Sequence, residues 1–274
     1  NDNALGPYTN YRIGTTNEGN RWCTSTDIGE ILAFESSLSL ENREKLEGYL
    51  AHKWGIEASL PNSHTYSSSA PSSWSPNDVS PAVWFDANDS STIDLVPHWL
   101  DKSNAGRVAA AHGSPVLNPT AINGMPAMSY SGANGQYHEF GDITNIRTIF
   151  WVLKKTGSNP NMLMLGDSSN SYFHPNGANA MWHLSHGPVA NVRGGTTKIN
   201  GTSVNGTSTG IPTTFSVVSL KTTGNVTASN FADDRHIVQS GVNRVFEGDL
   251  GELLIFNTAL DDSQISNIEY YLNV

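Results

Sequence analysis

Aromatic, amide and basic side chains gather in one stretch of the chain, and their chemistry suits a sugar ligand. The candidates for ligand contact are Tyr172, His174, Asn176, Trp182, His183, His186 and Arg193. An aromatic ring can cover the apolar face of a sugar, while imidazole, amide and guanidinium groups hydrogen-bond its hydroxyls. Trp182 has a second interpretation as a core residue, because it stands in an apolar run. His183 and His186 would point to opposite faces of a strand, which argues against a metal ion shared by the two.

Oxygen-bearing side chains cluster between residues 86 and 104. Asp86 and Asp89 follow an apolar run, and Asp101 and Asn104 lie in the next expected loop. Calcium binds about six to eight oxygen ligands. These four residues are therefore candidate calcium ligands, with Asx turns that cap the loop backbone as the alternative interpretation.

Two sequence motifs of common enzyme classes are missing. The chain has no H-E-x-x-H zinc-binding motif and no P-loop. The acidic pair Asp233–Asp234 offers a cation two charges, but solvated surface charge is the favoured interpretation. We therefore expect a chain that is not an enzyme. The alternative is a catalytic site that no known sequence motif marks.

Short strands must hold these side chains in place. From residue 82 onward, Gly, Asn and Ser separate a series of apolar runs of strand length. The runs are 83–86, 127–130, 148–153, 161–166, 180–185, 215–221 and 249–256. Seven or more short strands with no helix between them predict an all-β fold, an antiparallel β-sandwich or jelly roll with one or two short peripheral helices.

An internal repeat indicates two similar units. Residues 27–50 match residues 249–272 without a gap and with nine identities. Each copy begins with an apolar run that suits a buried strand and ends in an amphipathic helical pattern, with Ser39 as the expected N-cap of the first helix and Asp261 preceding the second. We therefore expect each unit to end in a strand and one short helix.

A glutamate recurs inside the strand of each copy, Glu30 in the first and Glu252 in the second. A glutamate between small and apolar residues usually accepts hydrogen bonds from a loop or pairs with a fixed cation. The candidate partners are Arg21 and Arg244, just upstream in the two copies. Structural support is the favoured role of these glutamates, with ligand contact as the alternative.

Composition divides the chain further and excludes several functions. Residues 64–80 are rich in Ser, Pro and Asn and predict a linker between a partial domain at 1–63 and a complete domain at 81–274.

With 15 Lys and Arg against 25 Asp and Glu, the net charge of -10 disfavours nucleic acid as a partner. No apolar run reaches the roughly 18 residues of a membrane-spanning helix. The single cysteine, Cys23, excludes a disulfide within the chain.

Four motifs, in this order, carry a resemblance to a known family. They are AVWFDANDSSTIDL, HWLDKSNAGRVAAA, INGMPAMSYSG and GDLGELLIFNTALDDSQISNIEYYL. Over about residues 82–274 the chain resembles the laminin G-like, concanavalin A-like jelly-roll domains of large exported bacterial proteins. Residues 1–60 resemble the closing third of another such domain, ending in EGYLAHKWGI and LPNSHTY, so we expect a fragment of a longer protein.

The resemblance implies a non-catalytic module of a secreted or cell-surface protein, in which such domains often carry calcium. It implies a polysaccharide or cell-surface glycan as ligand and neighbouring domains of the same polypeptide as partners. Two other roles are open: a purely structural spacer of an adhesin, and an accessory domain of a polysaccharide-degrading enzyme. Fold alone does not determine function. The choice among the glycan-binding, spacer and accessory-domain roles therefore depends on which side chains form a site.

Overall fold

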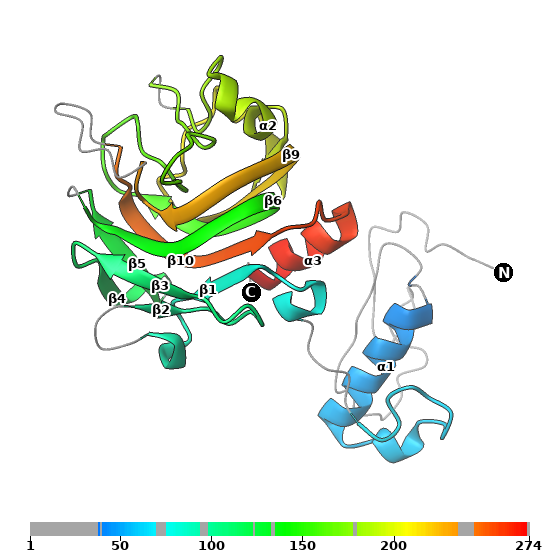
Figure 1. Ribbon diagram of the computed structural model, residues 1–274. Helices are drawn as coiled ribbons and strands as arrows, with labels where there is room; N and C mark the ends of the chain where they lie inside the picture. The colour runs from blue at the N-terminus through cyan, green and yellow to red at the C-terminus, as the bar shows by residue number, and fades with distance from the viewer. Residues whose placement is uncertain are drawn as a thin grey trace, which may run out of the picture. The chain divides into compact units, whose positions relative to one another are not determined.

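A computed structural model describes residue 38 and residues 40–69, 75–93, 98–122, 124–132, 135–177, 180–234 and 244–272 (Figure 1). Within it the chain divides into two compact units, Asn1–Ser73 and Trp74–Val274. Each unit is described by itself. Ser39, Glu30 and Arg21, which carried sequence predictions, lie outside the described residues.

The first unit contains the helix α1 (Leu40–Trp54) and the 3-10 helix η1 (Glu57–Ser59). After η1 the chain folds back along α1, where His52 Nε2 lies 2.9 Å from the Tyr66 carbonyl oxygen. The Thr65 hydroxyl donates to Glu44 over 2.7 Å. The first residues of the predicted 64–80 linker therefore lie against α1, because a backbone carbonyl and a hydroxyl group of this segment find partners on the helix.

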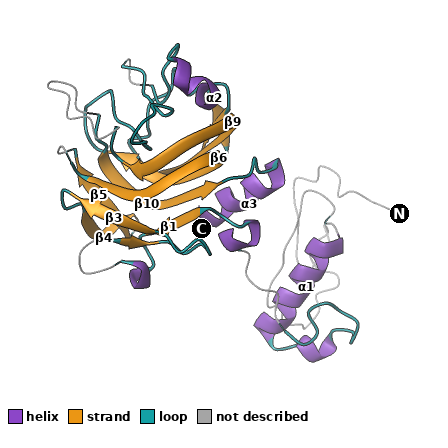
Figure 2. Cartoon of the chain, in the orientation of Figure 1, coloured by secondary structure: helices purple, strands orange, loops and turns teal. Residues whose placement is uncertain are grey.

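Most of the regular secondary structure in the second unit is β-strand (Figure 2). Its strands are β1 (Val83–Asp86), β2 (Trp99–Leu100), β3 (Val108–His112), β4 (Val116–Ile122), β5 (Met125–Ser131), β6 (Tyr137–Lys155), β7 (Thr196–Ile199), β8 (Thr202–Val204), β9 (Ser216–Phe231) and β10 (Glu247–Phe256). Its helices are η2 (Pro76–Val79), η3 (Ser90–Thr92), η4 (Gly187–Val189), α2 (Ala190–Arg193) and α3 (Asp262–Leu272). The all-β, antiparallel class predicted from the sequence is confirmed.

These strands form one antiparallel sheet in which β10 and β6 are central. The order along the sheet is β4-β5-β10-β6-β9-β7-β8, with β1 paired to β10 and β3 joining β2 to β6. The first half of β10 pairs with β5 and its second half with β1. In Figure 1 the long strands β6, β9 and β10 run side by side through the curved sheet. The strand predicted at 249–256 is therefore covered on both edges and both faces, which explains its nearly unbroken apolar sequence.

Two apolar clusters lie on opposite faces of the sheet. Alternate residues of β10 divide between them: Leu253 enters the larger cluster and Leu254 the smaller. The smaller cluster lies beneath α3, whose Ile265 and Ile268 are buried there. α3 begins after Asp261, which accepts a hydrogen bond from the Gln264 amide over 2.8 Å and so caps the helix.

Two of the predicted strands, 161–166 and 180–185, are wrong. Both segments are loops with only isolated bridges at Gly166 and Ala180. Their apolar side chains are nevertheless buried, because the loops cover the larger cluster with residues such as Met162, Leu165 and Trp182. The apolar runs in these two loops therefore reflect burial of their side chains and not strand pairing.

Candidate functional site

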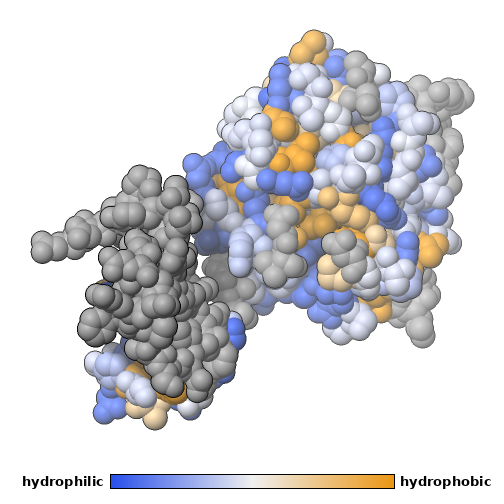
Figure 3. Space-filling model, turned by 180° about the vertical axis from the view of Figure 1, so that it is seen from behind, coloured by the Kyte–Doolittle hydropathy of each residue, from blue (hydrophilic) through white to orange (hydrophobic). Residues whose placement is uncertain are grey.

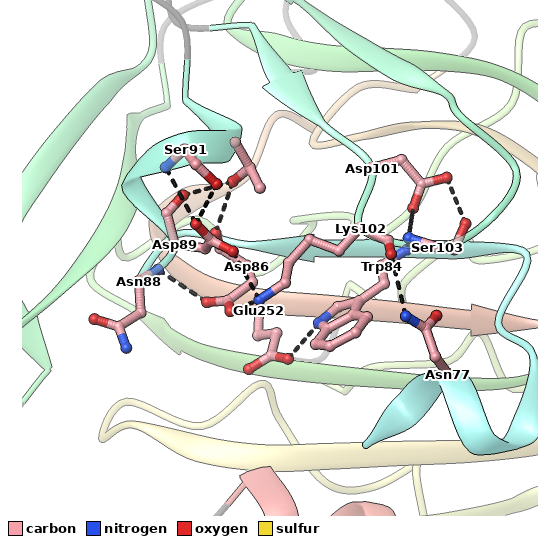
Figure 4. A network of polar contacts seen from close by, with 11 residues as sticks. Asn77, Trp84, Asp86, Asn88, Asp89, Ser91, Asp101, Lys102, Ser103 and Glu252 are labelled. Carbon is pink, nitrogen blue, oxygen red and sulfur yellow. Dashed lines mark hydrogen bonds and ion pairs between the residues drawn. The ribbon is translucent and has the colours of Figure 1, made fainter. Parts of the chain in front are cut away.

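Two of the three carboxylates predicted to bind calcium share a cation of the protein itself. Lys102 Nζ lies 2.7 Å from Asp86 Oδ2 and 3.1 Å from Asp89 Oδ2, between the two side chains (Figure 4). The ammonium also lies 4.4 Å from the centre of the Trp84 ring. A hydrogen bond from Ser91 and the bond to Lys102 lower the pKa of Asp89. Burial lowers the pKa of Lys102, but its bonds to both carboxylates outweigh that effect and the pKa is raised.

The other two calcium candidates take different places. Asp101 Oδ1 accepts hydrogen bonds of 2.8 Å from the amides of Trp84 and Ser103, so this carboxylate holds strand β1 against the loop after β2. Asn104 is exposed. In the described part of the chain, no three or more His, Cys, Asp or Glu side chains form a group that could hold a metal ion. The predicted calcium set does not fit this geometry, because Lys102 supplies the charge and backbone amides occupy the acceptors.

The loops at 171–193 bring three of the predicted ligand-binding histidines together. The rings of His174, His183 and His186 lie with their centroids 5.2 to 5.8 Å apart. The opposite-face prediction for His183 and His186 assumed a strand and is wrong, because the segment is a loop. His186 Nε2 lies 2.7 Å from the Ser171 hydroxyl, and His174 Nδ1 donates to the Pro175 carbonyl. Burial is the main cause that lowers the pKa of His174.

The remaining residues of that loop cluster support the loops. Trp182 is only 1% exposed and its indole donates to the Thr197 hydroxyl over 2.9 Å, so it is a core residue and offers no ring face to a ligand. Arg193 donates to the backbone carbonyl of His186 over 2.7 Å. Asn176 forms a backbone bridge, and Tyr172 packs at the edge of the larger cluster. Most polar groups of the cluster thus bond to the loops themselves.

The acidic pair Asp233–Asp234 is not on the surface, where the sequence analysis placed it. Asp233 and Asp234 are both buried, at 8% and 5% exposed. Asp234 Oδ2 lies 2.6 Å from Arg244 Nη1. The prediction of solvated surface charge is therefore wrong for this pair, and so is the prediction that Arg244 pairs with Glu252.

Glu252 bonds to an indole and a phenol instead. Its Oε1 accepts a hydrogen bond of 2.7 Å from Trp84 Nε1, and the Tyr271 hydroxyl forms a further bond to the carboxyl group. Asp86 lies directly opposite Glu252 in the pairing of β1 with β10. Burial first, and the neighbouring Asp86 carboxylate second, raise the pKa of Glu252 to about 8. At neutral pH this side chain is mostly an uncharged carboxylic acid.

Glu252 opens into a hollow of about 850 Å³ between the sheet and the end of α3. Its lining is mainly apolar and includes Met125 and Phe215, with Asp86, Asn88, Ser216 and Glu252 as polar groups. Tyr270 stands at this hollow and is 75% exposed. Figure 3 shows apolar surface among polar residues on one side of the second unit.

The geometry around the hollow arises from one irregularity in β10. The register between β10 and β6 shifts between Leu250 and Glu252, at Gly251. A side chain at Gly251 would meet Ile122, because a Cβ there would lie 2.5 Å from Ile122 Cδ1. The glycine thus lets the β4–β5 hairpin approach the sheet, and this hairpin forms one wall of the hollow.

No protein-family model matches the chain, and a search of curated proteins finds no match. Among the helices that the structure describes, none has the length and apolar content needed to span a bilayer.

Sequence reasoning missed Lys102 and Tyr270, and it assigned Glu252 the wrong partner. The signal for Tyr270 was available, because the apolar spacing of Ile265, Ile268 and Tyr271 along the helix leaves Tyr270 off the buried face. The pairing of Trp84 with Glu252 depends on which strands are neighbours, and the sequence does not specify that.

Proposed function

We propose that the chain is a non-catalytic module that binds a carbohydrate in the hollow beside α3, within a secreted or cell-surface bacterial protein. The observation that supports this best is Tyr270, an aromatic side chain 75% exposed at the edge of a hollow with polar groups in its lining. An exposed ring of this kind can stack on the apolar face of a sugar. The resemblance to laminin G-like domains of exported proteins points to the same class of ligand.

The size and composition of the hollow agree with this proposal. Ligand sites commonly enclose about 300 to 1,000 Å³ and combine an apolar lining with a few polar groups that fix orientation. The hollow has about 850 Å³, and Asn88, Ser216 and Glu252 are available to bond hydroxyls. We therefore prefer the hollow to the 171–193 loops as the location of the ligand.

The test is binding of the full chain to a panel of soluble polysaccharides, comparing the wild type with Tyr270→Ala. We expect a saturable ligand whose affinity falls at least tenfold in Tyr270→Ala, while the unfolding midpoint stays nearly unchanged because the ring is exposed. Tyr172→Ala in the other cluster is the matched control and should keep its affinity. Equal loss in both variants would reject the hollow as the site. A blank panel with folded protein would reject carbohydrate binding and favour the structural spacer.

A further inference from the structure

The hydrogen-bond partners of Glu252 determine what its own proton can do. The indole of Trp84 is a donor and has no acceptor, and it donates to Glu252 Oε1 over 2.7 Å. The bond with Tyr271 lowers the pKa of Glu252, as expected when the phenol donates to the carboxyl group. Both partners thus use the carboxyl group as an acceptor. When Glu252 is protonated, its O–H remains as a donor on the wall of the hollow.

The charges around Glu252 come from three sides. On β1, Asp86 lies opposite Glu252, and Asp89 follows just after the strand. The loop after β2 contributes Lys102, which pairs with both carboxylates. On α3, burial and the nearby Glu252 raise the pKa of Tyr271, so its hydroxyl stays neutral.

On the β6 side, the sheet neighbour of Glu252 is the apolar Val152. Farther along β6, Lys154 pairs with Asp249 over 3.1 Å, so its charge is compensated. The two carboxylates of Asp86 and Asp89 and the one ammonium of Lys102 give a net charge of about -1 at this edge of the hollow. A negatively charged sugar would meet this excess, whereas a neutral one would not.

These contacts lead to a statement about the ligand that rests on the proposed function. We infer that the hollow selects an uncharged, hydroxyl-rich glycan, and that Glu252 holds it by donating the proton of its neutral carboxylic acid to a sugar oxygen. Ionised Glu252 has no proton to donate and adds a second uncompensated charge. The affinity for the neutral glycan therefore falls as Glu252 ionises.

The pKa of Glu252, raised to about 8, sets the size of this effect. If only the protonated form binds, the apparent affinity scales with the protonated fraction. Between pH 6 and pH 9 the fraction, and with it the affinity, falls roughly tenfold. Glu252→Gln keeps an acceptor for Trp84 and a donor for the ligand at every pH. Its affinity should be similar to that of the wild type at pH 6 and constant up to pH 9.

The experiment uses the full chain and two readouts. The first is the ¹⁵N–¹H signal of the Trp84 indole, identified by its loss in Trp84→Phe, followed from pH 5 to pH 10 without ligand. The second is calorimetric binding of neutral hexamers of β-1,3-glucan, cellulose, xylan and mannan, and of acidic hexamers of alginate and galacturonate, at pH 6 and pH 9. Glu247→Gln, which removes a carboxylate from the same strand outside the hollow, is the control.

The expected result is an indole signal with a midpoint near pH 8 that is absent in Glu252→Gln and retained in Glu247→Gln. A neutral hexamer should then bind the wild type roughly tenfold more weakly at pH 9 than at pH 6. A neutral hexamer that binds equally at both pH values, or an acidic hexamer that binds as tightly, would overturn this inference and leave carbohydrate binding intact. If no hexamer binds while the indole signal titrates, the proposed function itself fails, and the inference with it.

Discussion

Replacing Glu252 by glutamine should change how the stability of the second unit depends on pH. The folded carboxyl group keeps its proton up to about pH 8, whereas the unfolded one loses it near the ordinary value of 4.5. The folded state therefore binds more protons between these values, and the free energy of unfolding of the wild type falls as pH rises through this range. The difference between the two pKa values corresponds to up to about 5 kcal/mol. Glutamine does not titrate and escapes this loss.

The assay is urea unfolding of the wild type and Glu252→Gln, followed by tryptophan fluorescence at intervals from pH 4 to pH 9.5. At pH 4 the two proteins should differ by no more than about 1 kcal/mol, because glutamine resembles the protonated acid and keeps an acceptor for Trp84. By pH 9 the variant should be the more stable by several kcal/mol. Glu247→Gln should run parallel to the wild type. A constant difference between wild type and Glu252→Gln across the whole range would refute the elevated pKa and the burial argument behind it.

Three further changes test other parts of the structure. Lys102→Met removes the cation that Asp86 and Asp89 share, and it should lower the free energy of unfolding by about 3 kcal/mol in urea titrations at pH 7; an unchanged midpoint would show that the pair is solvated. Trp182→Ala should cost about 3 to 5 kcal/mol of stability, and a variant that loses only glycan binding would show that the ring is a ligand platform after all. Gly206→Ala should lower the melting temperature, because the new Cβ would lie 2.1 Å from Trp182 Cδ1; a melting temperature equal to that of the wild type would contradict this close packing.

The sequence predicted the features that depend on local pattern. The run at 83–86 is β1, the run at 249–256 lies in β10, and each repeat copy contains the expected helix, α1 and α3. Turn residues and alternating or helical spacing are properties of residues close together in the chain, so they can be identified from the sequence alone. The antiparallel all-β class followed from the number of such runs.

The sequence was misleading where a side chain is satisfied by a residue far along the chain. Asp86 and Asp89 form a plausible calcium motif until Lys102 is placed between them, and no spacing rule gives that position. Trp84 and Glu252 are 168 residues apart and meet only because β1 pairs with β10. The histidines of the 171–193 loops show the same limit, because an apolar run taken as a strand is a loop that folds the rings together.

The internal repeat separates what supports the fold from what we propose for binding. Glu252 and Tyr271 bond to each other, and both residues recur in the first copy as Glu30 and Tyr49, with the same spacing of nineteen residues. In the second unit this bond joins the closing strand β10 to the closing helix α3, so it supports the fold. Tyr270 has no such counterpart, because the first copy has Gly48 there, where a Cβ would lie 2.5 Å from Tyr66 Cβ. The exposed ring is thus an addition to the shared scaffold, which is the pattern expected if Tyr270 contacts a ligand.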